Sequence, residues 1–80
     1  MIRGCEARDV DFREANMKEA DMCDTDLLRA LFRNTNLSES DFTHASNFDI
    51  DVKTNEIEGA KFSRYEAIRL LGGLGIELVD

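Results

Sequence analysis

The chain has 80 residues, a formal net charge of −7, two cysteines and no proline. This length allows one small domain, which needs disulfides, a metal, oligomerisation or an unusually regular architecture to be stable. The negative charge argues against direct binding to nucleic acid, which requires a basic face. No stretch approaches the roughly 18 consecutive apolar residues that a membrane span requires.

The two cysteines, Cys5 and Cys23, are too few for a disulfide framework, and the single histidine, His44, cannot complete a zinc site with them. We therefore expect two free thiols in a reducing cytosol, with no metal and no cofactor. The N-terminal residues lack the apolar core of a signal peptide, which also favours a cytoplasmic protein.

Small residues recur at every fifth position from Cys5 to Ala45, and large apolar residues recur two positions after them. These positions divide the chain into blocks of five residues, in which the small residue is the first member and the large apolar residue is the third. The second member is acidic or an amide in nearly every block, with Leu31 as an exception. The small first members are Cys5, Val10, Ala15, Ala20, Thr25, Ala30, Thr35, Ser40 and Ala45, and the third members are Ala7, Phe12, Met17, Met22, Leu27, Phe32, Leu37 and Phe42.

A period of five fits neither an α-helix, in which the apolar residues would drift around the axis, nor a flat strand, in which they would alternate between faces. First and third members share a face if the backbone between them is extended. The chain must then bend in every block before the next first member, so it winds into a coil. Stacked coils bury both sets of side chains and pair backbone groups between coils.

Blocks such as Ala15-Asn16-Met17 and Ser40-Asp41-Phe42 resemble the A(D/N)LXX signature of pentapeptide-repeat proteins. The resemblance implies an all-β, right-handed quadrilateral β-helix in which four blocks form one coil. The frame from Cys5 to Arg64 then corresponds to about three coils, and third members stack twenty positions apart. Expected columns are Phe12 with Phe32 and Val52, Met22 with Phe42 and Phe62, Met17 with Leu37 and Ile57, and Ala7 with Leu27 and Asn47.

The repeating pattern of residue types becomes less regular after Ala45, so we expect the last coil to be distorted. Asn47 occupies a position that normally holds an apolar residue, and Phe48 follows it. Either the Asn47 amide turns inward onto backbone groups, or a local irregularity brings Phe48 into the core. We favour the second alternative.

From Ser63 the period changes to that of a helix. Ser63 and Glu66 have the spacing of a capping box, Gly72-Gly73 is expected to end a short α-helix, and residues 74–79 alternate like a short strand. We divide the chain into a β-helix, 1–64, and a C-terminal cap, 65–80. This segment is similar to the cap of quinolone-resistance-type pentapeptide proteins, which implies a homodimer, and the alternative is a lid that seals only its own coil. The predicted interface residues are Tyr65, Ile68, Leu71, Leu74, Ile76 and Leu78.

The first coil exposes an open edge, for which two explanations compete. Either the chain is the C-terminal piece of a longer repeat protein, or the charges of Arg3, Glu6, Arg8 and Asp9 protect the edge.

The outward positions carry neighbouring acidic and basic columns, which on their own indicate a solvated surface. We find no catalytic constellation and expect no enzyme, no small-molecule substrate and no membrane partner. The sequence favours a non-catalytic binding or scaffold protein of unknown partner. The resemblance implies an alternative, a DNA mimic that binds DNA gyrase or topoisomerase IV and modulates it or protects it from quinolones. Its acidic surface would comprise Asp11, Asp21, Asp26, Asp41 and Asp51.

Overall fold

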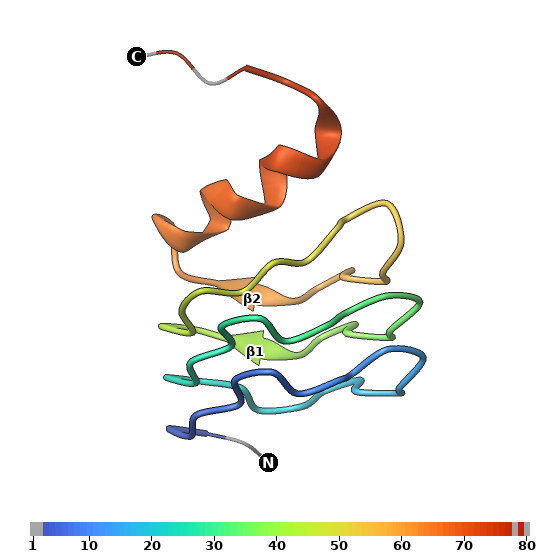
Figure 1. Cartoon of the computed structure of the whole chain (residues 1–80), viewed down its shortest axis with the longest axis vertical. Coiled ribbons are helices and arrows are strands. Elements are labelled where there is room, and N and C mark those ends of the chain that lie inside the picture. Colours follow the sequence, from blue (N-terminus) through green and yellow to red (C-terminus); the bar gives the residue numbers. More distant parts are fainter. Residues whose placement is uncertain (1–2, 78, 80) are drawn as a thin grey trace.

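The structure is a computed structural model that describes residues 3–77 and 79. The chain winds into a stack of flat coils, and a helix lies across the end opposite the N-terminus (Figure 1). The molecule measures 36 × 24 × 23 Å along its principal axes. It is thus a short rod, whose side walls are formed by the outward positions of each block.

Successive coils pair in parallel with an offset of twenty residues. Glu6 pairs with Asp26, and Asp26 pairs in turn with Ser46. The named strands β1 (Asp41–Phe42) and β2 (Lys61–Phe62) follow the same rule, with Asp41 opposite Lys61. Backbone hydrogen bonds of 2.7–3.1 Å join the coils, which satisfies amide and carbonyl groups that would otherwise be buried without partners. The offset implied by four five-residue blocks is confirmed by these pairs.

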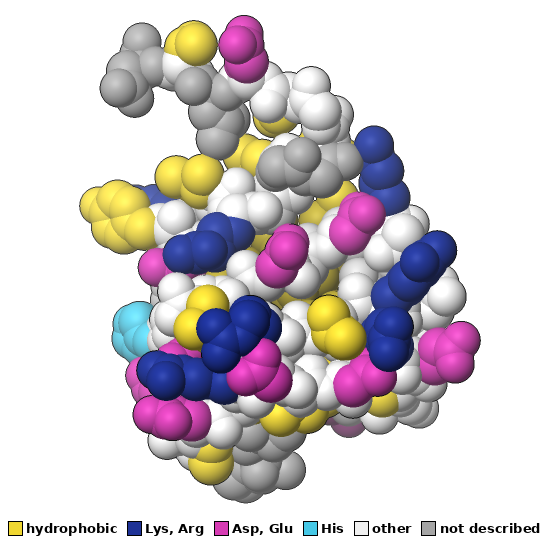
Figure 2. Space-filling model, viewed as in Figure 1, with side chains coloured by type: hydrophobic (Ala, Val, Ile, Leu, Met, Phe, Trp, Pro, Cys, Tyr) yellow, Lys and Arg dark blue, Asp and Glu magenta, His cyan; other side chains and the backbone are white. Residues whose placement is uncertain are grey.

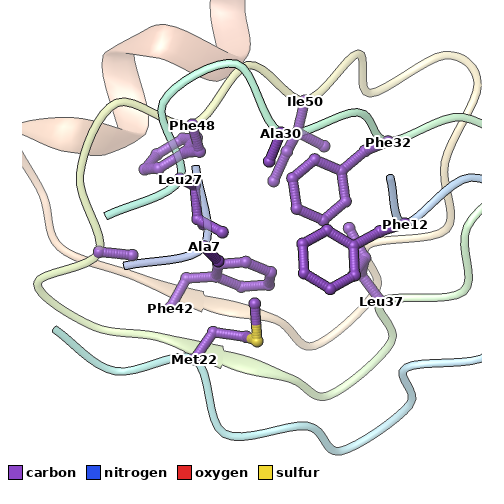
Figure 3. Close-up of a cluster of buried hydrophobic side chains, with 11 residues drawn as sticks. Ala7, Phe12, Met22, Leu27, Ala30, Phe32, Leu37, Phe42, Phe48 and Ile50 are labelled. Atoms are coloured by element: carbon purple, nitrogen blue, oxygen red, sulfur yellow. The ribbon is translucent and has the colours of Figure 1, made fainter. Parts of the chain in front are cut away.

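Most of the core consists of stacked third members, as predicted, and the small first members Ala30 and Ala45 are buried with them (Figure 3). The rings of Phe12 and Phe32 stack with centroids 5.1 Å apart, and those of Phe42 and Phe62 stack at the same distance. Leu27 is completely buried. Stacking of like residues at the coil spacing gives each ring an aromatic neighbour and fills the narrow interior.

Phe48 rather than Asn47 enters the core, as we favoured. Phe48 is 1% exposed, and its ring centroid lies 5.3 Å from that of Phe62. Asn47 has a positive φ of 57°, which turns its side chain outward, and its Nδ2 donates to Asp26 Oδ1 over 3.0 Å. The irregularity allows an aromatic residue to fill the weakest column of the core.

Most corners carry a non-glycine residue in the left-handed conformation. At a representative corner, Ala15 N–H donates to the Phe12 carbonyl, and Glu14 between them has φ of 61°. A positive φ in the third position is characteristic of a type II turn. The non-glycine fifth members with positive φ are Asp9, Glu14, Glu19, Asp24, Arg29, Asn34, Glu39 and His44.

The last coil departs from this regularity, as expected. Among the described residues the fifth members Asp49 and Thr54 lack a positive φ, and Gly59 resumes it at 75°. A Cβ at Gly59 would lie 3.1 Å from Glu39 Cγ, so the tight stacking of neighbouring corners also favours glycine there.

The C-terminal helix η1, Glu66–Leu74, is a 3₁₀-helix, so the prediction of an α-helix is wrong. The predicted capping box is also wrong: the Ser63 hydroxyl accepts a hydrogen bond from His44 N–H over 2.8 Å and leaves the helix without a side-chain cap. Without a cap, and with two glycines inside it, so short a helix gains little from α geometry.

The helix also ends later than predicted. It continues through Gly72 and Gly73 and ends before Gly75, whose φ of 68° is left-handed. A glycine in this conformation ends a helix without a steric penalty, whereas the two earlier glycines keep helical conformations. The short strand predicted for residues 74–79 is not formed by the described residues of this segment.

Candidate interaction surfaces

The aspartates of the predicted acidic surface stabilise the turns of the coils. In each case the side-chain Oδ1 accepts a hydrogen bond from the backbone N–H two residues later, which is an Asx turn. These bonds measure 2.8–3.2 Å and link Asp11 to Arg13, Asn16 to Lys18, Asp21 to Cys23, Asp26 to Leu28, Asn36 to Ser38, Asp41 to Thr43 and Asp51 to Lys53.

Arginines neutralise much of this acidic surface. Arg8 contacts Asp26 Oδ2 over 2.8 Å, and Arg3 contacts Asp21 Oδ2 over 3.1 Å, and each of these ion pairs joins neighbouring coils. Asp11 pairs with Arg13 within its own block. The remaining predicted acidic residues, Asp41 and Asp51, form no ion pair within the described residues. The five aspartates therefore do not present five uncompensated charges.

These contacts hold several carboxyl groups in their ionised form. The Arg13 guanidinium and backbone N–H lower the pKa of Asp11 to about 2. The pKa of Asp26 is lowered by the Asn47 amide and by Arg8, and that of Asp41 is lowered by the Thr43 hydroxyl and backbone N–H. Hydrogen bonds to the charged form favour it over the protonated form.

A second candidate surface is formed by apolar side chains of the C-terminal segment. Among the described residues, five of the seven exposed large hydrophobic side chains belong to this segment: Tyr65, Ile68, Leu74, Ile76 and Val79. Figure 2 shows hydrophobic side chains gathered at the end of the molecule that carries the helix. We call these five residues the C-terminal apolar face.

The predicted interface residues map largely onto this face. Tyr65 is 85% exposed and Ile76 is 52% exposed, whereas Leu71 is half-buried. Leu78 lies outside the described residues. Side chains three positions apart eclipse each other in a 3₁₀-helix, so Ile68, Leu71 and Leu74 follow one line along η1.

Leu70, which is not among the predicted interface residues, attaches the helix to the core. It is half-buried and packs against the hydrophobic cluster of the coils. A spacing of three from Ala67 places it on a different line of the 3₁₀-helix from Ile68. The sequence pattern contained this signal, but an assumed α-helical period obscured it.

The regular blocks also match a known family. The family model for pentapeptide repeats matches residues 2–27 and 18–46, with eight copies of the repeat. The chain belongs to the pentapeptide-repeat family. Its repeat β-helix is thus shown both by the paired coils and by the family match.

Solved structures similar to this pentapeptide-repeat chain include QnrB1, described as a plasmid-mediated fluoroquinolone resistance protein. A trypsin-treated variant of QnrB1 is 21% identical with a TM-score of 0.43, and the match covers 94% of this chain and 42% of that chain. Full-length QnrB1 is 22% identical with a TM-score of 0.41, over 89% of this chain and 40% of that chain. This chain therefore spans less than half the length of QnrB1. No curated protein matches it by sequence.

Neither a metal centre nor a membrane-spanning helix is found in the described part of this pentapeptide-repeat protein. No group of three His, Cys, Asp or Glu side chains there could hold a metal ion. No helix there is long and apolar enough to cross a bilayer. Cys5 and Cys23 are free thiols, and His44 is an exposed residue whose Nδ1 lies 3.6 Å from Asp24.

Proposed function

We propose that this chain is a non-catalytic protein that acts through surface interactions, and that about three right-handed coils present a C-terminal cap for homodimerisation. The observation that carries the proposal is the C-terminal apolar face. Exposed apolar side chains are gathered there, while the coil walls are covered mainly by charged and polar groups. Such a concentration of apolar surface is typical of an interface.

A second copy of this chain is the occupant that we favour. The face carries apolar residues flanked by both signs of charge, with Arg69 contacting Glu66 over 2.8 Å and Glu77 exposed nearby in the chain. A surface with both signs can be complementary to itself when two copies meet about a two-fold axis. A strongly basic partner would instead be attracted to the more acidic coil walls.

The test is the mass in solution of wild type and of Ile68→Asp. Ile68 is 53% exposed, so an aspartate there costs little in the isolated chain but would bury a charge in the dimer. We expect wild type to have the mass of a dimer by light scattering and Ile68→Asp that of a monomer.

Leu31→Asp is the matched control. Leu31 is 46% exposed on a coil wall, where an aspartate would restore the side-chain oxygen that caps neighbouring turns. This variant should keep the mass of wild type. If wild type were a monomer at high concentration, the dimer would be refuted. The C-terminal segment would then be a lid that covers only its own coil.

The alternative function is a DNA mimic that binds DNA gyrase or topoisomerase IV. The formal charge of −7 favours it, because an acidic rod can enter a groove that binds duplex DNA. The arginines beside Asp11, Asp21 and Asp26 weaken it, because they reduce the field that such a groove would recognise.

A supercoiling assay with and without a quinolone separates the two functions. A DNA mimic would inhibit gyrase or restore its activity in the presence of the drug, and Asp41→Asn with Asp51→Asn would weaken that effect. An interaction protein of another kind would leave gyrase unchanged at micromolar concentration.

A further inference from the structure

One wall of the coil stack contains a polar groove of about 540 Å³. Its lining is rich in amides and hydroxyls, and Ala15 is its only apolar side chain. The lining residues are Glu14, Ala15, Asn16, Asn34, Thr35, Asn36, Lys53, Thr54, Asn55 and Glu56, and we call this the asparagine groove.

The amide groups of Asn16 and Asn36 present hydrogen-bond donors to this groove. The two residues pair in neighbouring coils. Each Oδ1 accepts the backbone N–H two residues later, over 3.2 and 3.1 Å. This bond fixes the orientation of the amide and directs Nδ2 outward, and no hydrogen bond within the described residues engages either Nδ2.

The corresponding positions on the other walls are mostly aspartates, and in three of these the second oxygen lies against an arginine. Asp26 Oδ2 accepts from Arg8 in this way, and Asp11 Oδ2 accepts from Arg13. An amide caps the turn as an aspartate does, but it exposes a donor where the aspartate exposes a charged acceptor. The asparagine groove therefore differs chemically from the rest of the surface, while its turns remain capped.

The groove also lies beside a turn in which a side-chain amide replaces the usual backbone hydrogen bond. At regular corners the N–H of a first member donates to the carbonyl three residues earlier, as Ser40 does to Leu37 over 3.1 Å. At Thr35 this bond is replaced: Thr35 N–H donates to Asn55 Oδ1 over 3.1 Å, and Asn55 Nδ2 donates to the Phe32 carbonyl over 3.3 Å. The inserted amide holds the corner open beside the Asn16–Asn36 pair.

The lining selects a chemical class of ligand. Glu14 and Glu56 contribute two negative charges and Lys53 one positive charge, so the groove has a formal charge of −1 and does not favour an anion. Its lining contains no large hydrophobic or aromatic side chain of the kind that lines most sites for drug-like molecules. Amide donors and carboxylate acceptors lie side by side, and hydroxyl groups can satisfy both because each donates and accepts.

We propose that the asparagine groove binds a neutral saccharide. The Asn16 and Asn36 amides donate to sugar oxygens, and Glu14 and Glu56 accept from sugar hydroxyls. The site is on the coil wall and uses none of the residues of the C-terminal apolar face, so it does not depend on dimerisation.

The test is an NMR titration of the full chain with three neutral probes: maltotriose, cellotriose and triacetylchitotriose. We expect at least one probe to shift the side-chain amide signals of Asn16 and Asn36, with Kd on the order of 1 mM, as befits a shallow polar site. Asn16→Asp keeps the oxygen that caps its turn but removes the donor. It should weaken binding by about tenfold, the value of one good hydrogen bond.

Asp41→Asn is the matched control, because it makes the reverse exchange on another wall and should bind the same probe as wild type does. Trigalacturonate and a Gly-Ser hexapeptide test an anionic sugar and a polypeptide as ligands. The proposal is overturned if no neutral probe shifts the two amide signals. It is equally overturned if only the anionic sugar or the peptide does so, or if Asn16→Asp, with an unchanged fold by backbone amide shifts, binds as tightly as wild type.

Discussion

At the scale of single residues, the corners combine a side-chain cap with an unfavourable backbone conformation. Glu14 and Glu19 have φ of 61° and 63°, a region that residues other than glycine, asparagine and aspartate rarely adopt. The preceding Asp or Asn compensates by accepting the N–H that begins each turn. Local geometry thus favours Asp or Asn as the second member of a block, independently of any role that its charge has in binding.

We predict that Glu19→Asn stabilises the protein. Glu19 is exposed, and its side chain forms no hydrogen bond or ion pair within the described residues, so its replacement removes no polar interaction. Asparagine tolerates a positive φ better, and the free energy of unfolding should rise by about 0.5–1 kcal/mol. Glu19→Val, with a branched Cβ, should lower it by about 1 kcal/mol. Urea unfolding followed by circular dichroism measures both, and equal stability of the two variants would contradict the role of φ.

We also predict that the protein loses stability in acid. The pKa of Asp11 is about 2 in the folded protein, below its value of about 4 in an unfolded chain, so the unfolded chain takes up protons first as the pH falls. The stabilisation that the ionised Asp11 adds to the free energy of unfolding is complete above pH of about 4 and is lost as the pH falls to about 2. Urea midpoints across this range check the prediction. Asp11→Asn keeps the cap and should show a smaller dependence on pH, whereas identical dependence would exclude Asp11 as a source.

At the scale of elements, the C-terminal helix divides its apolar residues between two tasks. Leu70 packs onto the last coil, whereas Ile68 and Leu74 remain exposed. Three residues per turn in the 3₁₀-helix separate these residues onto different lines. A single short helix can therefore cover the core and still present an apolar line outward.

We predict that Leu70→Ala loosens the helix. Leu70 is half-buried, so its truncation should cost about 1–2 kcal/mol and speed hydrogen exchange of the amides of Glu66–Leu74. Ile68→Ala is the matched control and should leave exchange unchanged. Both are measured at the lowest practical concentration, so that association does not contribute. Equal exchange in the two variants would mean that Leu70 does not attach the helix.

At the scale of the whole molecule, the C-terminal end of the rod and its walls have different chemistry. The walls combine acidic residues with arginines that bridge coils, as in the pair of Arg29 with Asp9 over 2.6 Å. The C-terminal end is apolar. If two copies associate there, folding and association become linked, and a small domain gains the stability that its own core limits.

We therefore predict that the thermal midpoint rises with protein concentration. Mass action favours the folded dimer, so a dilution series should lower the midpoint of wild type. The midpoint of Ile68→Asp should not depend on concentration, because this variant is expected to be a monomer. Differential scanning calorimetry over the series checks both statements, and a constant midpoint for wild type would oppose linked dimerisation.

Much of the fold could be predicted because a five-residue period reports directly which side chains face inward. The stacks of Phe12 with Phe32 and of Phe42 with Phe62 follow from the period and the four-block coil, and the entry of Phe48 follows from the polar Asn47 in the frame. Hydrophobic burial acts on whole columns, so the pattern of residue types was sufficient to predict which side chains face inward. Which of them stack on one another followed only from the four-block coil that the family resemblance implied.

The tertiary structure alone decided how the polar groups are used. Arg8 reaches Asp26 and Asn55 enters the turn at Thr35 because coil stacking brings together residues some twenty positions apart. The same holds at the cap, where Ser63 bonds to His44 instead of capping its own helix. Hydrogen bonds depend on distances and angles between neighbouring coils, and these exist only once the coils are stacked.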